Sequence, residues 1–301
     1  MSKSTATASK IPRDRQNVSA RIERLDSGPP ADVLHVANQY KLANRAIKAG
    51  CDLFRLGDRS EAIYRLVDGW VALYNLLADG RKQILQFSLP GTILAFVPMR
   101  GAVISYSAQA LTDVVVGVIP HKDLERLSSD NPGFGMQLAG LISQDRGLAY
   151  DHLSSIGRRS ARERVAYLLL ELFIRSRLCW PGHRGEEMYL PLTQEHIGDA
   201  TGLTGVHVNR VLQDLRKERV AEFHYRHLRI MNPDKLVDIA GIDPHVALSW
   251  INNDSSDEAV TNHRKRGDVA ATAPLDAKRR PASRSSLPSL ERRLLQWNCA
   301  T

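Results

Sequence analysis

The segment Leu192–Leu215 restricts the possible folds more than any other part of the chain. Thr193 is placed to cap a first helix, and Gly202 stands where that helix must end and the backbone must turn sharply. Leu203 can fill the angle between two helices, and Thr204 can cap the second helix. Apolar residues at helical spacing give this second helix one buried side: Val208, Val211, Leu212 and Leu215. Together these features predict a helix-turn-helix.

The outward side of the second helix carries residues suited to DNA. The major groove of B-DNA admits one α-helix, whose N-terminal residues then meet the base edges. We expect base reading by Arg210, Asn209, Val206, His207 and Gly205, with Arg210 placed for a bidentate contact to guanine and a valine suited to a thymine methyl group. We expect contacts to the sugar-phosphate backbone from Thr193, Thr204, Gln213, Lys217 and Arg226.

A short hairpin follows this motif directly. Val220–Phe223 and His227–Ile230 read as strands with basic residues at the turn between them, and Asp234–Ala240 reads as a closing helix. A hairpin in this place is a wing that can lie along the DNA backbone. The sequence therefore predicts a winged helix-turn-helix.

The region Cys51–Pro120 has a different texture, with short apolar runs separated by turn residues. Asp68-Gly69 and Asp79-Gly80 each stand between two apolar runs, which is a strong hairpin signal because both turn residues tolerate positive φ. Val103–Ile119 adds more β-branched residues. The pattern predicts an antiparallel β-roll of the jelly-roll kind.

Helical periodicity precedes and follows this β region. We expect short helices over Ala31–Lys48 and Asp123–Leu127, and a long helix over Pro132–Ile156. Ser160 and Glu163 form a capping box that opens another helix, Ala161–Leu178. The long helix has an apolar stripe that either pairs with a partner helix or packs on its own barrel; the residues expected to dimerise are Leu138, Leu141, Ile142, Leu148 and Ile156.

The predicted fold class is thus α+β, with a sensory β-roll, a dimerisation helix and a C-terminal winged helix-turn-helix. The expected organisation is a disordered arm over 1–20, the β-roll over 21–120, the dimerisation helix over 121–158, the DNA-binding domain over 159–241 and a basic, largely disordered tail over 242–301. The chain has a net charge of +8, but residues 261–301 alone hold nine Lys or Arg and three Asp or Glu. Charge therefore supports DNA binding only weakly, and the motif carries the prediction.

These pieces together resemble the Crp/Fnr family of bacterial regulators over roughly Ala49–Gly241. The β region matches through Leu53–Asp58, Ala62–Val71 and Asp79–Leu85, and the C-terminal region through Leu192–Gly198 and Gly202–Arg210. The resemblance implies a homodimer that binds double-stranded DNA at a two-fold symmetric operator. It also implies RNA polymerase as a partner and an unknown small-molecule or redox effector.

The effector residues of that family do not carry over. Its cyclic-nucleotide pocket uses a glutamate for the ribose and an arginine–serine pair for the phosphate. Here Phe96 stands at the glutamate position and Ile104 at the arginine position, so we expect no binding of cyclic AMP. Its oxygen-sensing branch uses an N-terminal cysteine set, and no cysteine precedes Cys51. The recognition helix also differs, because Val206 replaces a glutamate that many members carry.

The remaining composition narrows the alternatives. No run of about 18 apolar residues predicts a membrane span, and the N-terminus lacks a secretory signal, so a cytoplasmic location is expected. No cofactor and no metal site are expected. A redox-responsive regulator acting through Cys179 or Cys51 stays open, with nearby arginines expected to lower the thiol pKa of Cys179. A metal-dependent β-roll enzyme is disfavoured because Cys51–Pro120 contains no histidine.

Overall fold

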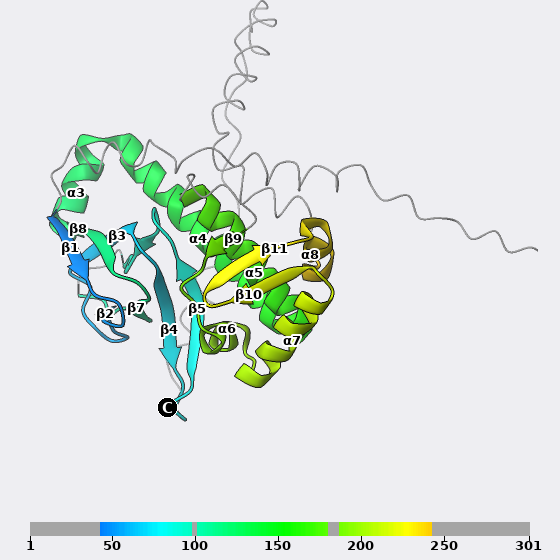
Figure 1. The fold of residues 1–301 in the computed structure, drawn as a ribbon. Helices are drawn as coiled ribbons and strands as arrows, with labels where there is room; N and C mark the ends of the chain where they lie inside the picture. The colour runs from blue at the N-terminus through cyan, green and yellow to red at the C-terminus, as the bar shows by residue number, and fades with distance from the viewer. Residues whose placement is uncertain (1–42, 98–100, 180–186, 243–301) are drawn as a thin grey trace, which may run out of the picture. The chain divides into compact units, whose positions relative to one another are not determined.

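A computed structural model describes residues 43–97, 101–179 and 187–242. Figure 1 shows strands in the N-terminal part, then a run of helices, then a small mixed domain. The N-terminal strands are β1 (Ala43–Ile47), β2 (Asp52–Phe54), β3 (Ala62–Asp68), β4 (Val71–Leu76), β5 (Lys82–Ser88), β6 (Ile93–Leu94), β7 (Ser107–Ala110) and β8 (Val114–Pro120). The elements that follow are α3 (His121–Asp130), α4 (Pro132–Arg158), α5 (Ala161–Cys179), β9 (Glu187–Tyr189), α6 (Gln194–Thr201), α7 (Gly205–Lys217), β10 (Ala221–His224), β11 (His227–Ile230) and α8 (Pro233–Ala240).

The β-roll consists of two four-stranded antiparallel sheets, with strand orders β1-β8-β3-β6 and β2-β7-β4-β5. Apolar side chains from both sheets fill the space between them, among them Leu66, Val71, Leu94 and Val116. This alternation of inward apolar and outward residues is what the strand period of two predicts. The predicted antiparallel β-roll is confirmed.

The two Asp-Gly turns have different roles. Asp79-Gly80 joins β4 to β5, which pair as a hairpin as predicted. The hairpin expected at Asp68-Gly69 is wrong, because β3 pairs with β8 and β6 in one sheet while β4 pairs with β5 and β7 in the other. Gly69 is needed for packing, since a Cβ there would lie 2.5 Å from the carbonyl oxygen of Asp113. Asp68-Gly69 is thus a turn, as the pattern predicts, but the strands on its two sides belong to different sheets.

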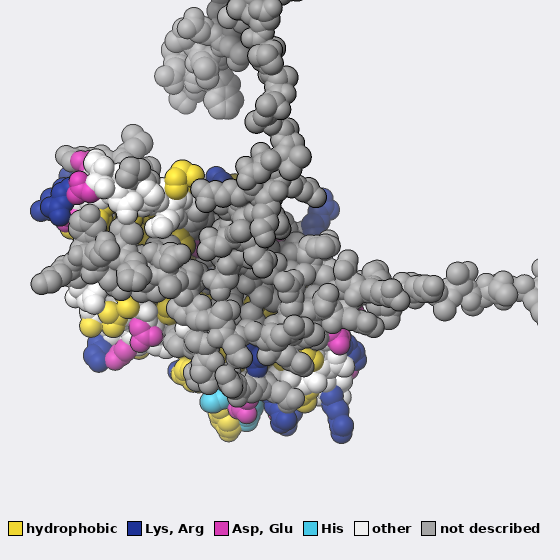
Figure 2. Space-filling view, turned by 90° about the horizontal axis from the view of Figure 1, so that it is seen from above, with side chains coloured by type: hydrophobic (Ala, Val, Ile, Leu, Met, Phe, Trp, Pro, Cys, Tyr) yellow, Lys and Arg dark blue, Asp and Glu magenta, His cyan; other side chains and the backbone are white. Residues whose placement is uncertain are grey.

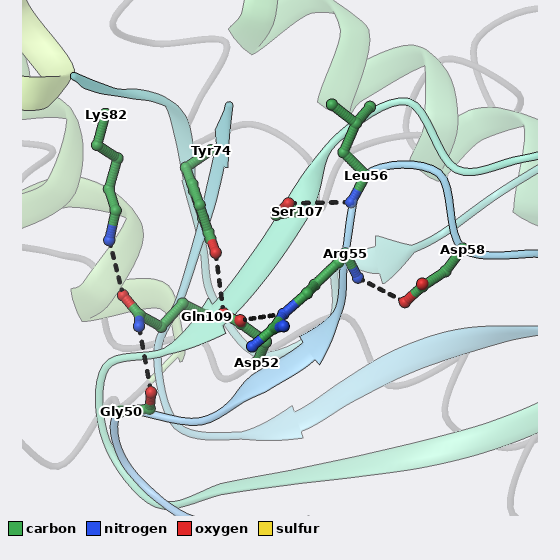
Figure 3. Close-up of polar contacts among 9 residues, drawn as sticks. All are labelled: Gly50, Asp52, Arg55, Leu56, Asp58, Tyr74, Lys82, Ser107 and Gln109. Carbon is green, nitrogen blue, oxygen red and sulfur yellow. Dashed lines mark hydrogen bonds and ion pairs between the residues drawn. The ribbon is translucent and has the colours of Figure 1, made fainter. Parts of the chain in front are cut away.

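The outer face of the β2-β7-β4-β5 sheet carries a ladder of polar contacts (Figure 3). Asp52 accepts hydrogen bonds from Tyr74 Oη at 3.1 Å and from Arg55 Nε at 2.8 Å. Gln109 accepts from Lys82 Nζ at 3.1 Å and donates to the carbonyl of Gly50 at 3.1 Å. Tyr74 of β4 and Lys82 of β5 each reach over one intervening strand, so these contacts tie the four strands of the sheet together.

The helices around the β-roll lie close to where the sequence predicts them. Helix α3 begins two residues before Asp123, and α4 begins at Pro132. The capping box of α5 forms as predicted, because the N–H of Ser160 donates to the carboxylate of Glu163 at 2.6 Å. The helix expected over Ala31–Lys48 is wrong at its end, because Ala43–Ile47 is β1, held by pairing with β8. The rest of that segment, the arm 1–20 and the tail from residue 243 lie outside the described residues. Ile242, the first residue of the expected tail, is buried in the core of the C-terminal domain.

Candidate nucleic-acid interface

The corner between α6 and α7 is built from close backbone contacts. Thr193 caps α6 by accepting the His196 N–H at 3.1 Å, and Gly202 ends it with φ of 68°. The N–H of Leu203 then donates to the carbonyl of Gly198 at 3.0 Å, which closes the turn. From α5, Arg164 donates to the carbonyl of Thr201 at 3.1 Å and so satisfies a carbonyl at the end of α6. The predicted helix-turn-helix is confirmed.

Sequence reasoning missed two residues of this corner. Gly198 packs so tightly on the turn that a Cβ there would lie 2.6 Å from the carbonyl oxygen of Leu203. His196 completes a capping box, because its Nδ1 accepts the Thr193 N–H at 3.3 Å. Burial, and then the nearby Lys82, lower the pKa of His196, which favours the neutral ring that this hydrogen bond needs. A glycine inside a short helix is a sequence signal that could have identified Gly198. A histidine at this capping position gives no comparable signal for His196.

Helix α7 divides sharply into a buried and an exposed side. Thr204 caps it by accepting the His207 N–H at 3.4 Å. The four predicted core residues, Val208, Val211, Leu212 and Leu215, are all buried. The predicted base readers Gly205, Val206, His207, Asn209 and Arg210 are all exposed, and so is Gln213. Val206 is an apolar side chain with 74% of its surface exposed, which an isolated domain has no packing reason to keep.

The C-terminal end of α7 is held by ion pairs on several sides. Arg216 pairs with Glu222 of β10 at 2.9 Å, and Lys217 approaches Asp214 at 3.9 Å. Glu218 pairs with Arg162 of α5 at 2.6 Å and with Lys235 of α8 at 2.8 Å. These two cations lower the pKa of Glu218 to about 2. The end of the recognition helix is thus tied to α5, α8 and the wing.

The wing is a three-stranded sheet in the order β10-β11-β9. The sequence predicted β10 and β11 but missed β9, a three-residue strand beside segment 180–186, which lies outside the described residues. The turn residues Tyr225 and Arg226 both have positive φ, and Tyr225 is 85% exposed. Arg226 therefore projects at the wing tip. Figure 2 shows Lys and Arg side chains, with His beside them, at the lower edge of the view.

The residues expected to dimerise through α4 occupy different environments. Leu138 is buried and Ile142 packs beside it, both against Ile63 and Ile119 of the β-roll, so these two serve the chain's own core. Leu141, Leu148 and Ile156 are half-buried, and Leu148 packs on the core that includes α5. The exposed apolar residues of α4 are instead Met136 at 76%, Tyr150 at 61% and Leu153 at 68%.

The two described cysteines lie in different surroundings. Cys179 is largely buried, and its Sγ contacts the carbonyl of Pro90 at 3.5 Å. Burial raises the thiol pKa of Cys179 to about 11, which outweighs the opposite influence of Arg175. The expected low pKa is therefore wrong. Cys51 is exposed and unpaired with the other described cysteine.

In the ranges 43–97, 101–179 and 187–242, no His, Cys, Asp and Glu side chains gather into a group able to hold a metal ion. No helix in these same ranges is long and apolar enough to cross a membrane.

Comparisons with known proteins agree with this geometry. A model of the cyclic nucleotide-binding domain matches residues 44–131, and a model of the Crp-like helix-turn-helix domain matches residues 163–239. The nitrogen fixation regulation protein FixK of Rhizobium meliloti is 30% identical over 63% of this chain and 83% of its own length. The fumarate and nitrate reduction regulatory protein of Vibrio cholerae is 28% identical over 66% of this chain and 78% of its own.

A solved structure has a similar fold. FixK2 from Bradyrhizobium japonicum is 28% identical, with a TM-score of 0.60 over 67% of this chain and 98% of that one. The named relatives are regulators and not enzymes. The architecture of a β-roll, a long helix and a helix-turn-helix is therefore shared with solved regulator structures.

Proposed function

Because the chain belongs to the Crp/Fnr family of bacterial transcription regulators, we propose that α7 enters the major groove and reads its operator through the exposed side of its first two turns. The observation that carries this proposal is the sharp division of α7. Its apolar residues from Val208 onward are buried, whereas the residues at its N-terminal end, including the apolar Val206, face outward without cover from the rest of the domain. A single helix with such an exposed end fits the major groove of B-DNA.

Each exposed residue has a role that its chemistry suits. Arg210 pairs with guanine O6 and N7, and Asn209 pairs with adenine or a neighbouring phosphate. Val206 contacts a thymine methyl group, His207 lies beside it, and Gly205 allows the helix end to approach the bases closely. Contacts to the DNA backbone come from Thr193, Thr204, Gln213, Lys217 and Arg226. Because Thr193 accepts the His196 N–H, its hydroxyl proton remains for a phosphate oxygen, whereas the hydroxyl of Thr204 also lies 3.4 Å from His207 Nδ1.

We further propose that the regulator is a homodimer paired through the exposed side of α4. Met136, Tyr150 and Leu153 leave this side apolar, and small residues between them, including Gly140 and Gly147, let a second α4 approach closely. Leu138 and Ile142 are not part of this surface. A two-fold axis along α4 places two copies of α7 on half-sites about one helical turn apart, or about 34–36 Å.

The wider proposal places this dimer in the cytoplasm, where it acts with RNA polymerase on transcription. The relatives are a nitrogen fixation regulation protein and a fumarate and nitrate reduction regulatory protein, and the order of the two matched domains in this chain supports the proposal.

The reading of DNA is tested first by sequencing the DNA fragments that the purified protein retains, which gives the half-site and its spacing. Arg210→Ala is then compared with Lys217→Ala on the selected operator and on random DNA. Loss of a bidentate base contact corresponds to about 1–3 kcal/mol, or roughly 5- to 150-fold in affinity, on the operator only. Lys217→Ala should weaken both DNAs alike and reduce the salt slope by about 0.9. Equal operator binding by Arg210→Ala and the parent protein contradicts the assignment.

The dimer surface is tested by Tyr150→Glu combined with Leu153→Glu. Two charges on the paired side should give monomers in sedimentation and weaken binding to a full operator far more than to a half-site. Lys122→Glu, a change on the exposed surface of α3, is the matched control and should remain a dimer. A dimer in both variants contradicts the proposed surface.

A further inference from the structure

The β-roll places two segments face to face at the position where nucleotide-binding members of the family hold their ligand. One segment is 93–97, where the family's ribose-binding glutamate is replaced by Phe96. The other is 103–107, where the phosphate-binding arginine is replaced by Ile104. In this chain a hydrogen bond joins the two segments directly, because the N–H of Ala95 donates to Tyr106 Oη at 3.0 Å.

Ala95 shows why this bond is needed. It is fully buried, and its φ of 55° is rare for a residue with a side chain. A buried backbone N–H without a partner is costly, so either a ligand or a side chain must accept from it. Tyr106 is that acceptor, and the hydroxyl of Ser60 donates to the carbonyl of Ala95 at 3.4 Å. Both backbone groups of Ala95 are therefore satisfied from within the domain.

The ring of Tyr106 is held in the same place by packing. It meets Phe54 edge-on, with 5.7 Å between centroids, and Phe54 stacks on Tyr64 at 5.8 Å. Ile104 is buried in the apolar core of the roll, and Phe96 packs with α3 and α4 instead of facing that core. Hydrocarbon thus occupies both positions that would bind a cyclic nucleotide.

The side of the roll next to α4 is closed by a second polar contact. Gln86 of β5 donates to the carboxylate of Asp145 on α4. Burial raises the pKa of Asp145, and the same burial disfavours an anionic phosphate at this contact. Arg175, the nearby cation on α5, is already paired with Glu171 at 2.7 Å. Arg65 is buried, but it lies on the opposite face of β3 from Tyr64, which faces the core of the roll.

From these contacts we propose that the β-roll is closed by its own Tyr106, which takes the place of an effector, so that operator binding requires no small molecule in the roll. This inference rests on the proposed function, because it concerns how DNA binding is regulated. Tyr106 is a positioning residue here: it joins segments 93–97 and 103–107, and Gln86 and Asp145 join the roll to α4.

The first test uses thermal unfolding of the full chain, a readout that needs no DNA. Cyclic AMP or cyclic GMP at millimolar concentration should leave the Tm of the parent protein unchanged, whereas a bound ligand would raise it by mass action. Tyr106→Phe keeps the ring but removes the acceptor for Ala95, so its Tm should fall by several degrees. Tyr64→Phe, on the other side of Phe54, is the matched control and should melt close to the parent. A Tm increase with either nucleotide, or equal melting of the two variants, overturns the proposal.

The second test restores the missing group chemically. Tyr106→Ala removes a phenol ring, so added phenol should raise the Tm of this variant and leave the parent unchanged; benzene, which lacks the hydroxyl acceptor, should have a smaller effect. A folded variant that ignores phenol contradicts the proposal, and if the variant does not fold, the comparison of Tyr106→Phe with Tyr64→Phe decides. The parent protein is also denatured, dialysed and refolded to remove any bound small molecule. Adding cyclic AMP should then change its affinity for the operator by less than about twofold, whereas an allosteric effector typically changes affinity by roughly 5- to 150-fold. If the refolded parent binds no DNA under any condition, the proposed function fails, while the thermal results still judge the closed roll.

Discussion

Replacing Gly198 by alanine is the smallest change that should disturb the DNA-reading corner. The new Cβ would lie 2.6 Å from the carbonyl oxygen of Leu203, below the 3.0 Å that such contacts essentially never cross, so the two atoms must separate by about 0.4 Å or more. Neither atom belongs to a flexible side chain, and Gly198 also accepts the hydrogen bond from Leu203 N–H. The turn itself must therefore move, and it carries the first residues of α7 with it.

The expected magnitude follows from this overlap. Overpacking at a rigid contact costs about 1–3 kcal/mol. For a domain of this size each kcal/mol lowers Tm by about 4–8 °C, so the unfolding transition of the C-terminal domain should fall by roughly 4–24 °C. Base contacts need placement to about 0.5 Å, so operator affinity should fall by about the loss of one bidentate pair, at least roughly fivefold.

Calorimetry and fluorescence anisotropy with the selected operator measure these two effects. Gly205→Ala is the thermal control, because a Cβ at Gly205 meets no atom within 4 Å and should keep or slightly raise Tm. If Gly198→Ala melts and binds like the parent protein, then the close contact between α6 and the turn does not set the position of α7, and the reasoning is refuted.

Three further predictions concern titrating groups. Burial raises the pKa of Asp145, so the folded state holds a proton on this carboxyl group at pH values where the unfolded chain has lost it. The free energy of unfolding therefore falls as pH rises through that window. Asp145→Asn, whose amide oxygen can still accept from Gln86, should remove this fall and stabilise the protein at neutral pH, as measured by denaturant titration. Arg162 and Lys235 lower the pKa of Glu218 to about 2, so its stabilising effect is complete above about pH 4.5 and is lost as pH falls toward 2; Glu218→Gln should flatten this acid limb in thermal unfolding. The raised pKa of Cys179, about 11, predicts slow alkylation by iodoacetamide in the native protein, with Cys51 modified first in peptide mass spectra; equal rates would contradict the burial of Cys179.

The sequence predicted best the features that are encoded locally. The caps Thr193 and Thr204, the left-handed Gly202 and the apolar spacing of α7 act over a few residues, so their pattern fixes the helix-turn-helix without knowledge of the rest of the fold. The outward face of α7 follows from the same spacing. The base-reading residues could be named for this reason, although the bases they meet could not.

The errors concern contacts between segments distant in sequence. The run after Asp68-Gly69 looked like the second strand of a hairpin, but a strand leaving a turn can also cross to another sheet, and only the partners β8 and β7 decide which. The apolar stripe of α4 could face a partner or its own β-roll. In the structure Leu138 and Ile142 pack on the roll, because Ile63 and Ile119 lie opposite them. The arginines near Cys179 could lower its pKa only if the thiol met water, and burial by Pro90 and its neighbours was not visible locally.

The same distinction explains why the operator-reading domain is easier to interpret than the sensory domain. In α7 each outward residue can change without altering the buried side, so specificity varies residue by residue along one helix. In the β-roll, the backbone N–H of Ala95 is buried and needs an acceptor. Tyr106, eleven residues further along the chain, supplies that acceptor. The residues at the two effector positions, Phe96 and Ile104, can be read from the sequence, whereas the contact between Tyr106 and Ala95 is seen only in the structure.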